Sequence, residues 1–197
     1  LATIYPGPLK VEPDIVRLLL TKSWLFAIEK YIIEMIIKSI MIKNSFQILI
    51  SDLEAETTPL IEQSISSFRN SLKECSYTLY NKEMIQEFLA LEFDNEVLNA
   101  FEKLKPFAFK ADLARYCIAY KYGGWYADIT LKFIKNIDGH LDDIEFLGFT
   151  DLGGGITPNQ LPYAIQSSLF YSSKNSIIME KAIQIILENC RNNYYGV

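Results

Sequence analysis

The sequence predicts an α/β protein whose central sheet is mostly parallel and flanked by helices. Short apolar runs that are typical of strands alternate with stretches of helical periodicity between about residues 46 and 192. Residues 109–131 combine a helical pattern, a double glycine and a period-2 pattern in one short unit. Half of the 197 residues are hydrophobic and 22% are charged, as in ordinary globular domains.

The elements can be assigned in order along the chain. Prolines at positions 6, 8 and 13 indicate an irregular start, and a helical stretch follows over roughly residues 14–40. Strands are predicted at 46–50, 77–80 and 144–149, and helices at 60–72, 84–89, 97–101, 109–122 and 176–192. We expect Asn81 to cap the second of these helices and Asp94 or Asn95 the third. Gly153–Gly155 suggest a flexible loop.

Composition narrows the classes of function. The formal net charge of −5 argues against a nucleic-acid-binding surface, which is usually basic. The three cysteines are far apart, odd in number and without a C-x-x-C pair, so we expect neither a disulfide framework nor a zinc site. A reducing compartment, and therefore a cytoplasmic location, is the better prediction.

Residues 24–42 are apolar enough to raise the question of a membrane. Charged residues at positions 29, 30, 34 and 38 interrupt this stretch, whereas a spanning helix needs roughly 20 mostly uncharged residues. We predict a packed helix within an N-terminal helical extension, residues 1–40. A helix that lies on a membrane surface, and so gives peripheral membrane association, is the alternative.

Residues 109–131 carry the most chemistry. Asp112 and Arg115 are three positions apart and share one flank of the predicted helix, beside an apolar stripe. The double glycine at 123–124 ends the helix. In the strand predicted after it, Tyr126, Asp128 and Thr130 face the same way, with apolar residues on the other side. One short unit can thus present two carboxylates, a guanidinium and a phenol to a single crevice.

This stretch closely resembles the sugar-binding region containing DXD motif of glycosyltransferase family 32, with the pattern K-x-D-x-x-R-Y-x-x-L-Y-x-x-G-G-x-Y-x-D-x-D. The matching residues are Lys110, Asp112, Arg115, Tyr116, Tyr120, Gly123, Gly124, Tyr126 and Asp128. Thr130 stands where the family has its last carboxylate. So many fixed spacings are far more specific than an isolated D-x-D. The resemblance implies a GT-A fold, Rossmann-like and nucleotide-sugar-binding, over residues 41–197.

The resemblance also implies an activity. It is the transfer of a hexose from a UDP- or GDP-linked donor to a saccharide or other hydroxyl acceptor, with retention of configuration, in capsule, lipopolysaccharide or glycan synthesis. By position, Asp112 and Arg115 would bind sugar hydroxyls, Arg115 would also lie near the diphosphate, and Tyr126 would lie against the ribose. Asp128 and Arg115 are the predicted catalytic residues.

A divalent cation, Mn or Mg, is the cofactor that the resemblance implies. Hard cations of this kind take oxygen ligands. Asp128 falls on the family position that contacts the ribose and the metal shell, and Thr130 falls on the position of the direct metal ligand. A hydroxyl ligates more weakly than a carboxylate, so metal affinity should drop unless another carboxylate compensates. Asp138 and Asp151 are candidates by residue type only.

Outside the core motif the resemblance is looser. Residues 41–51 align with the opening strand I-P-K-x-I-H-Q-x-W, in which Gln47 fits but Phe46 and Leu49 replace the usual His and Trp. Residues 145–172 look like the segment that follows the metal motif. On this basis we include Gln47 and Gln166 among the predicted substrate-binding residues. Because similar proteins usually continue beyond residue 196, we expect part of the C-terminal acceptor region to be missing.

Each residue also has a simpler interpretation. Asp112 and Arg115 alone would most often be a surface ion pair, and Tyr126 alone would be a packing residue. Asp128 is harder to explain structurally, because aspartate opposes β-propensity and its burial is costly without partners. For the whole chain, the alternatives are a catalytically degenerate member that binds without turnover, and a secreted effector that glycosylates a host protein.

Overall fold

The computed structural model describes residues 28–30, 43–51, 57–137, 141, 144–151 and 164–194. Contacts divide the chain into one unit, Leu1–Ile42, and a second unit, Lys43–Val197. In the first unit only residues 28–30 are described, as part of a helix, so the predicted extension over 1–40 lies almost wholly outside the described residues and stays a prediction. Among the described residues, none of the helices is both long and apolar enough for a membrane span.

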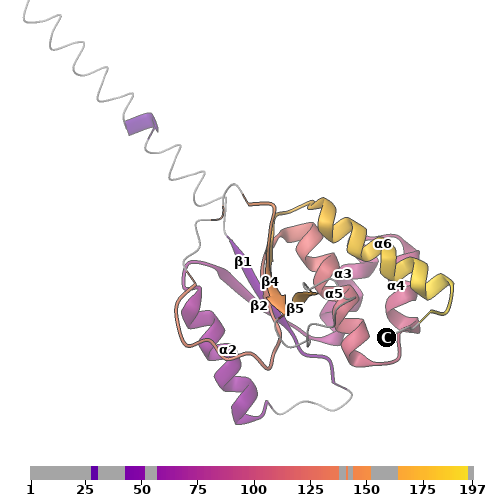
Figure 1. Ribbon diagram of the computed structural model, residues 1–197, viewed down its shortest axis with the longest axis horizontal. Helices are drawn as coiled ribbons and strands as arrows, with labels where there is room; N and C mark the ends of the chain where they lie inside the picture. Colours follow the sequence, from indigo (N-terminus) through magenta and orange to yellow (C-terminus); the bar gives the residue numbers. More distant parts are fainter. Residues whose placement is uncertain are drawn as a thin grey trace, which may run out of the picture. The chain divides into compact units, whose positions relative to one another are not determined.

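One sheet organises the second unit (Figure 1). Its strands are β1 (Asn44–Ile48), β2 (Ser76–Tyr80), β3 (Gly124–Ala127), β4 (Phe146–Asp151) and β5 (Ala164–Ser172), in the order β2-β1-β3-β5-β4. β1 pairs in parallel with both β2 and β3, whereas β5 pairs antiparallel with both β3 and β4. All the described strands except β5 therefore run the same way, and the predicted α/β class with a mostly parallel sheet is confirmed.

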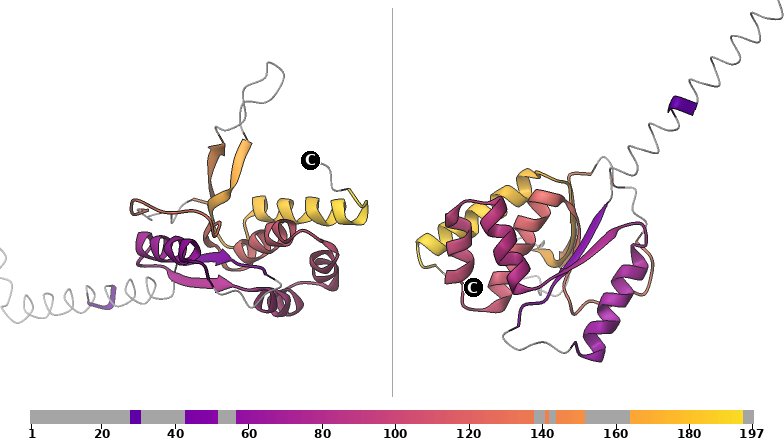
Figure 2. Two further views of the ribbon diagram at one scale, coloured as in Figure 1. Left: turned by 90° about the horizontal axis from the view of Figure 1, so that it is seen from below. Right: turned by 180° about the vertical axis from the view of Figure 1, so that it is seen from behind.

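Helices cover both faces of this sheet (Figures 1 and 2). They are α2 (Pro59–Ser71), α3 (Lys82–Glu92), α4 (Asn95–Lys103), α5 (Phe107–Tyr122) and α6 (Ile177–Arg191). On the face of α2, Phe68 packs with Trp125 and Tyr171. On the face of α3 to α6, Tyr126 and Phe170 join a larger core. Alternate residues of β3 thus serve opposite cores, as strand geometry requires.

Side-chain caps fix where several helices begin. The amide of Met84 donates to the Asn81 side chain, 2.9 Å away, at the start of α3. Asp94 accepts from the amides of Glu96 and Val97 at the start of α4, so Asp94 rather than Asn95 is the cap. Ser176 caps α6 in the same way. The caps expected from the sequence are therefore confirmed.

The strands differ from the sequence analysis in two respects: one prediction was wrong and one strand was not predicted. β3 ends at Ala127, and Asp128–Leu131 form a turn in which the Leu131 amide donates to the Asp128 carbonyl oxygen, 3.0 Å away. Asp128 therefore lies directly after the strand rather than inside it. β5 was not predicted at all, because a bulge between Gly148 and Phe149 breaks its pairing with β4 and disturbs the alternation of its side chains. The loop predicted at 153–155 lies outside the described residues.

Candidate active site

The double glycine determines how closely α5 and β3 join. Gly123 and Gly124 have φ angles of 66° and 109°, which side chains rarely tolerate. A Cβ on Gly124 would lie 2.2 Å from the Asn44 carbonyl oxygen, and one on Gly123 would lie 2.8 Å from the Lys174 amide nitrogen. The chain can therefore turn from α5 directly into the middle of the sheet. As a result, the polar flank of α5 lies against the residues that follow β3.

Arg115 is the centre of a cluster at this junction. It is only 5% exposed. Its guanidinium pairs with the Asp112 carboxylate, lies 3.2 Å from Asp128 Oδ1 and donates to the Ser167 carbonyl oxygen at 2.8 Å. It also lies 4.9 Å from the centre of the Tyr126 ring. A surface ion pair does not describe this arrangement, because the cation is buried and is bonded to two other segments as well as to its own helix.

Tyr126 completes the cluster from β3. Its hydroxyl donates to Asp128 Oδ1 at 2.6 Å, and its ring packs between Phe46 and Phe170. Burial is the main cause that raises the pKa of Tyr126, and the neighbouring Asp128 carboxylate adds to it, although Arg115 opposes the shift. The phenol therefore stays protonated at neutral pH and remains a hydrogen-bond donor.

The main chain of Asp128 is held by the neighbouring strand β5 and by Gln47 from the opposite face of the sheet. Its amide donates to the Ser168 carbonyl oxygen at 2.8 Å, and its carbonyl oxygen accepts from Gln47 Nε2 at 3.2 Å. The same Gln47 amide donates to Ser64 on α2 and accepts from the Tyr77 hydroxyl on β2. Gln47 is fully buried. Its partners are thus protein groups, which favours positioning of Asp128 over the direct substrate contact that we predicted.

Among the described residues, no hydrogen bond or ion pair joins the other predicted site residues to the cluster. Thr130 is exposed in the turn after β3. Gln166 is exposed on β5, opposite Phe149, and among the described residues no hydrogen bond joins it to Arg115 or Asp128. Asp138 lies outside the described residues, and only the backbone of Asp151 is described. The structure therefore gathers Asp112, Arg115, Tyr126, Asp128 and Gln47, but not Thr130 or Gln166.

The cluster is rich in oxygen atoms of the kind that bind metal ions, and it carries excess negative charge. Two carboxylates flank one guanidinium, so formal negative charge exceeds positive charge by one. Asp128 and Asp112 each keep about a third of their side chain exposed. In the part of the chain that the structure describes, no group of three or more His, Cys, Asp or Glu residues is arranged to hold a metal ion. A cation here would need further oxygens from a ligand or water.

Some residues of the site could not be predicted from residue types. Ser167 and Ser168 act through their carbonyl oxygens, which any residue possesses. Ser64 and Tyr77 act through Gln47. The weak match of Gln47 to the family's opening strand was the signal that pointed toward this buried network.

Part of the chain is similar in sequence to known glycosyltransferases. Residues 58–147 match the family model described as "Glycosyltransferase sugar-binding region containing DXD motif". An "Uncharacterized glycosyltransferase L373" of Acanthamoeba polyphaga mimivirus is 39% identical over 70 residues, which are 36% of this chain and 26% of the relative. Over the matched region the predicted family resemblance is confirmed. The chain spans only about a quarter of this relative.

A solved structure shares the fold. "PaToxG Glycosyltransferase" has a TM-score of 0.58 at 14% sequence identity, and the match covers 78% of this chain and 63% of the solved chain. At this identity the likeness concerns the fold alone. It confirms the predicted GT-A-like α/β architecture.

Proposed function

Because residues 58–147 match the family model described as "Glycosyltransferase sugar-binding region containing DXD motif", we propose that this chain is a glycosyltransferase domain. It transfers a hexose from a UDP- or GDP-linked donor to a hydroxyl group of a saccharide or other acceptor. The observation that carries the proposal is the buried junction in which Arg115 contacts both Asp112 and Asp128. A buried guanidinium of this kind is well suited to phosphate oxygens.

The reaction sets the requirements for this site. The bond between the anomeric carbon and the diphosphate oxygen breaks, and its electron pair leaves with the diphosphate. The acceptor oxygen bonds to the same carbon and its proton leaves with the departing phosphate. Negative charge thus grows on the diphosphate in the transition state, and the positive charge of Arg115 stabilises it there. We keep retention of configuration and a role in glycan synthesis as expectations from the family resemblance.

The neighbouring residues then have distinct tasks. Asp112 accepts hydrogen bonds from sugar hydroxyls while its pairing with Arg115 fixes its direction. Tyr126 holds the Asp128 carboxylate through its hydroxyl. Gln47 holds the backbone of Asp128 from the face of the sheet that α2 covers. These contacts preorganise the site, because each polar side chain is already restrained by a second group.

A divalent cation fits this donor set in part. Mg²⁺ sites often use only one or two carboxylates and take their other ligands from substrate phosphates. Asp128 supplies one carboxylate, Thr130 could supply a hydroxyl two residues later, and the excess negative charge of the cluster favours a bound cation. When bound, Mn²⁺ or Mg²⁺ would neutralise charge on the diphosphate.

Calorimetry tests the proposal directly. A protein of residues 1–197 is titrated with UDP-glucose and GDP-mannose, with and without manganese, and with the free nucleotides. We expect binding to at least one nucleotide sugar, tighter with manganese. If neither these donors nor a wider panel of nucleotide sugars binds to the folded chain, the proposal is wrong.

A second candidate is a degenerate domain that binds without turnover. The exposed Thr130 hydroxyl at the position of the family's last carboxylate favours it. Thr130→Asp separates the two functions, with Thr130→Asn as the uncharged control. A large gain in turnover with Asp but not with Asn, from a nearly silent parent, would support the degenerate domain. Equal turnover of parent and Thr130→Asp would show that the hydroxyl is sufficient.

A further inference from the structure

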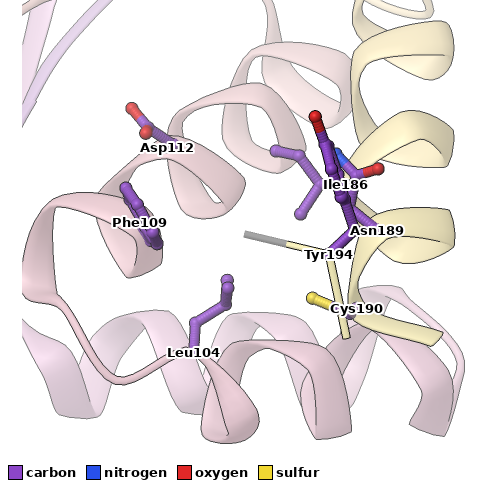
Figure 3. A pocket seen from close by; sticks show the side chains of 7 residues that line it. All are labelled: Leu104, Phe109, Asp112, Ile186, Asn189, Cys190 and Tyr194. Carbon is purple, nitrogen blue, oxygen red and sulfur yellow. The ribbon is translucent and has the colours of Figure 1, made fainter. Parts of the chain in front are cut away.

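A small cavity adjoins the proposed sugar site (Figure 3). It lies where the start of α5 faces the end of α6 and has a volume of about 140 Å³. Apolar walls come from Leu104, Phe109 and Ile186, and polar groups come from Asp112, Asn189 and Tyr194. The cavity therefore contacts Asp112, which the proposed function assigns to the transferred sugar.

The direction of the cavity follows from the helix. Phe109, Asp112 and Arg115 are spaced three residues apart on α5, so they form one row along a flank of the helix at about 4.5 Å per step. Phe109 and Asp112 line the cavity, but Arg115 does not. The cavity thus lies on the side of Asp112 that faces away from the guanidinium. A sugar bound to Asp112 would have its diphosphate toward Arg115 and its remaining substituents toward Phe109.

Size limits what the cavity can hold. Pockets for drug-sized ligands have volumes of roughly 300–1,000 Å³, so a whole nucleotide sugar does not fit. A cavity of about 150 Å³ can hold a ring the size of benzene. The volume here therefore suits one substituent of a larger ligand whose other parts lie outside.

The side chains that line the cavity indicate which kind of substituent it favours. Leu104 and Cys190 are almost fully buried, and Ile186 and Phe109 point into the same space (Figure 3). The apolar part of the lining favours a methyl group over a hydroxyl, because a hydroxyl that faces Leu104, Phe109 and Ile186 would lose its water without gaining a partner. The Asn189 amide could bind a polar atom of the same substituent.

We infer that this cavity selects the transferred sugar by holding a methyl-bearing substituent. The inference rests on the proposed function. The methyl-bearing substituent is either an acetamido group at ring carbon 2 or the methyl group of a 6-deoxy sugar. One additional methylene in a hydrophobic pocket changes specificity by about 10- to 200-fold. We therefore expect a preference of at least about 10-fold for the donor that carries this group.

Matched donors test the inference. Calorimetry on residues 1–197 compares UDP-N-acetylglucosamine with UDP-glucose, and GDP-rhamnose with GDP-mannose, so that each pair shares its base. A preference in the first pair identifies the acetamido group, and one in the second identifies the 6-methyl group. Free UDP and GDP serve as references for nucleotide binding without the sugar.

Neighbouring isoleucines on α6 provide a matched pair of variants. Ile186→Phe fills the cavity and should reduce the preference to within about 3-fold, while the affinity for the free nucleotide stays unchanged. Ile185→Phe makes the same change at a position that is 58% exposed and does not line the cavity, so it should keep the preference. Phe109→Ala removes one wall and should also lower the preference.

The outcomes separate this inference from the proposed function. Equal binding within both pairs would overturn the inference and leave the proposed function intact, because nucleotide sugars would still bind. A preference that survives in both Ile186→Phe and Phe109→Ala would also overturn it. Loss of binding to every nucleotide sugar by the wild-type chain would overturn both.

Discussion

The two ends of β3 are built in opposite ways. At its amino end, Gly123 and Gly124 pack against backbone atoms so closely that neither leaves room for a Cβ. At its carboxyl end, Asp128 is held by polar contacts, and the turn that follows reaches solvent at Thr130. β3 itself is only four residues long. The tightly packed backbone at the amino end thus helps to fix the direction of the partly exposed Asp128 carboxylate at the carboxyl end.

Gly124→Ala should have the largest effect, because it disrupts the close backbone packing at the amino end of β3. The new methyl group would meet the Asn44 carbonyl oxygen at 2.2 Å, in a backbone conformation with φ of 109°. We expect a loss of at least about 3 kcal/mol in the free energy of unfolding. Urea unfolding followed by circular dichroism measures this loss.

Thr130→Ala is the matched control in the exposed turn after the carboxyl end of β3. Thr130 is exposed, so the free energy of unfolding should change by no more than about 0.5 kcal/mol. If both variants lost similar stability, the proposed contrast between the two ends of β3 would be wrong.

Asp128→Asn should have the next largest effect, on activity rather than on the fold. We expect turnover to fall by about 100- to 1,000-fold, as for the loss of one electrostatic contact to a transition state. The fold should survive because the Arg115 guanidinium keeps its contacts with Asp112 and the Ser167 carbonyl oxygen. Product formation is compared with the unfolding free energy of the same variant. Full activity in Asp128→Asn would show that the active site has been assigned wrongly.

Tyr126→Phe should have a smaller effect. It removes the hydroxyl that donates to Asp128 at 2.6 Å but leaves the ring packed on Phe46 and Phe170. Because Asp128 is partly exposed, we expect a cost of about 1 kcal/mol in stability. A double-mutant cycle with Asp128→Asn measures the coupling between the two side chains. Additive effects would rule out the positioning role that we give to the phenol.

Alkaline pH should have the smallest effect. It should act on the contacts that hold Asp128 at the carboxyl end of β3. Burial raises the pKa of Tyr77 to about 12 from an ordinary value of 10. Because the pKa is higher in the folded state, its contribution to stability is complete below pH 10 and is lost as the pH rises toward 12. After allowance for partial exposure, we expect a loss of about 0.5 kcal/mol at pH 10.5.

Tyr77 matters here because its hydroxyl donates to Gln47, which holds the Asp128 backbone. Urea unfolding at pH 9 and pH 10.5 measures the effect, with Tyr77→Phe as the control, in which this part of the loss should disappear. An identical pH dependence in the wild type and Tyr77→Phe would exclude Tyr77 as its source.

Much of the fold and the centre of the site could be predicted from periodicity and spacing. The i, i+3 spacing of Asp112 and Arg115 placed them on one flank of a helix, and the double glycine marked its end. The family motif then predicted that Tyr126 and Asp128 meet them, and the structure brings all four together.

The remaining features depend on the tertiary structure. β5 has an irregular pairing with β4, so its sequence lacks a clear period of two. Asp128 leaves the strand because its carbonyl oxygen accepts the Leu131 amide and closes a turn, and the side-chain pattern continues unchanged through that turn. The burial of Gln47 follows from contacts with two other elements that are distant in sequence.

The position of β5 between β3 and β4 has a consequence for synthesis on the ribosome. β4 is translated before β5, but within the described sheet it pairs only with β5. The carbonyl oxygen that accepts from the buried Arg115 guanidinium comes 52 residues after it in the chain. Since a nascent chain emerges from its amino end, α5 and β3 leave the ribosome before this acceptor exists. Within the described sheet, the strand that is translated last is therefore the one that supplies this contact to the proposed site.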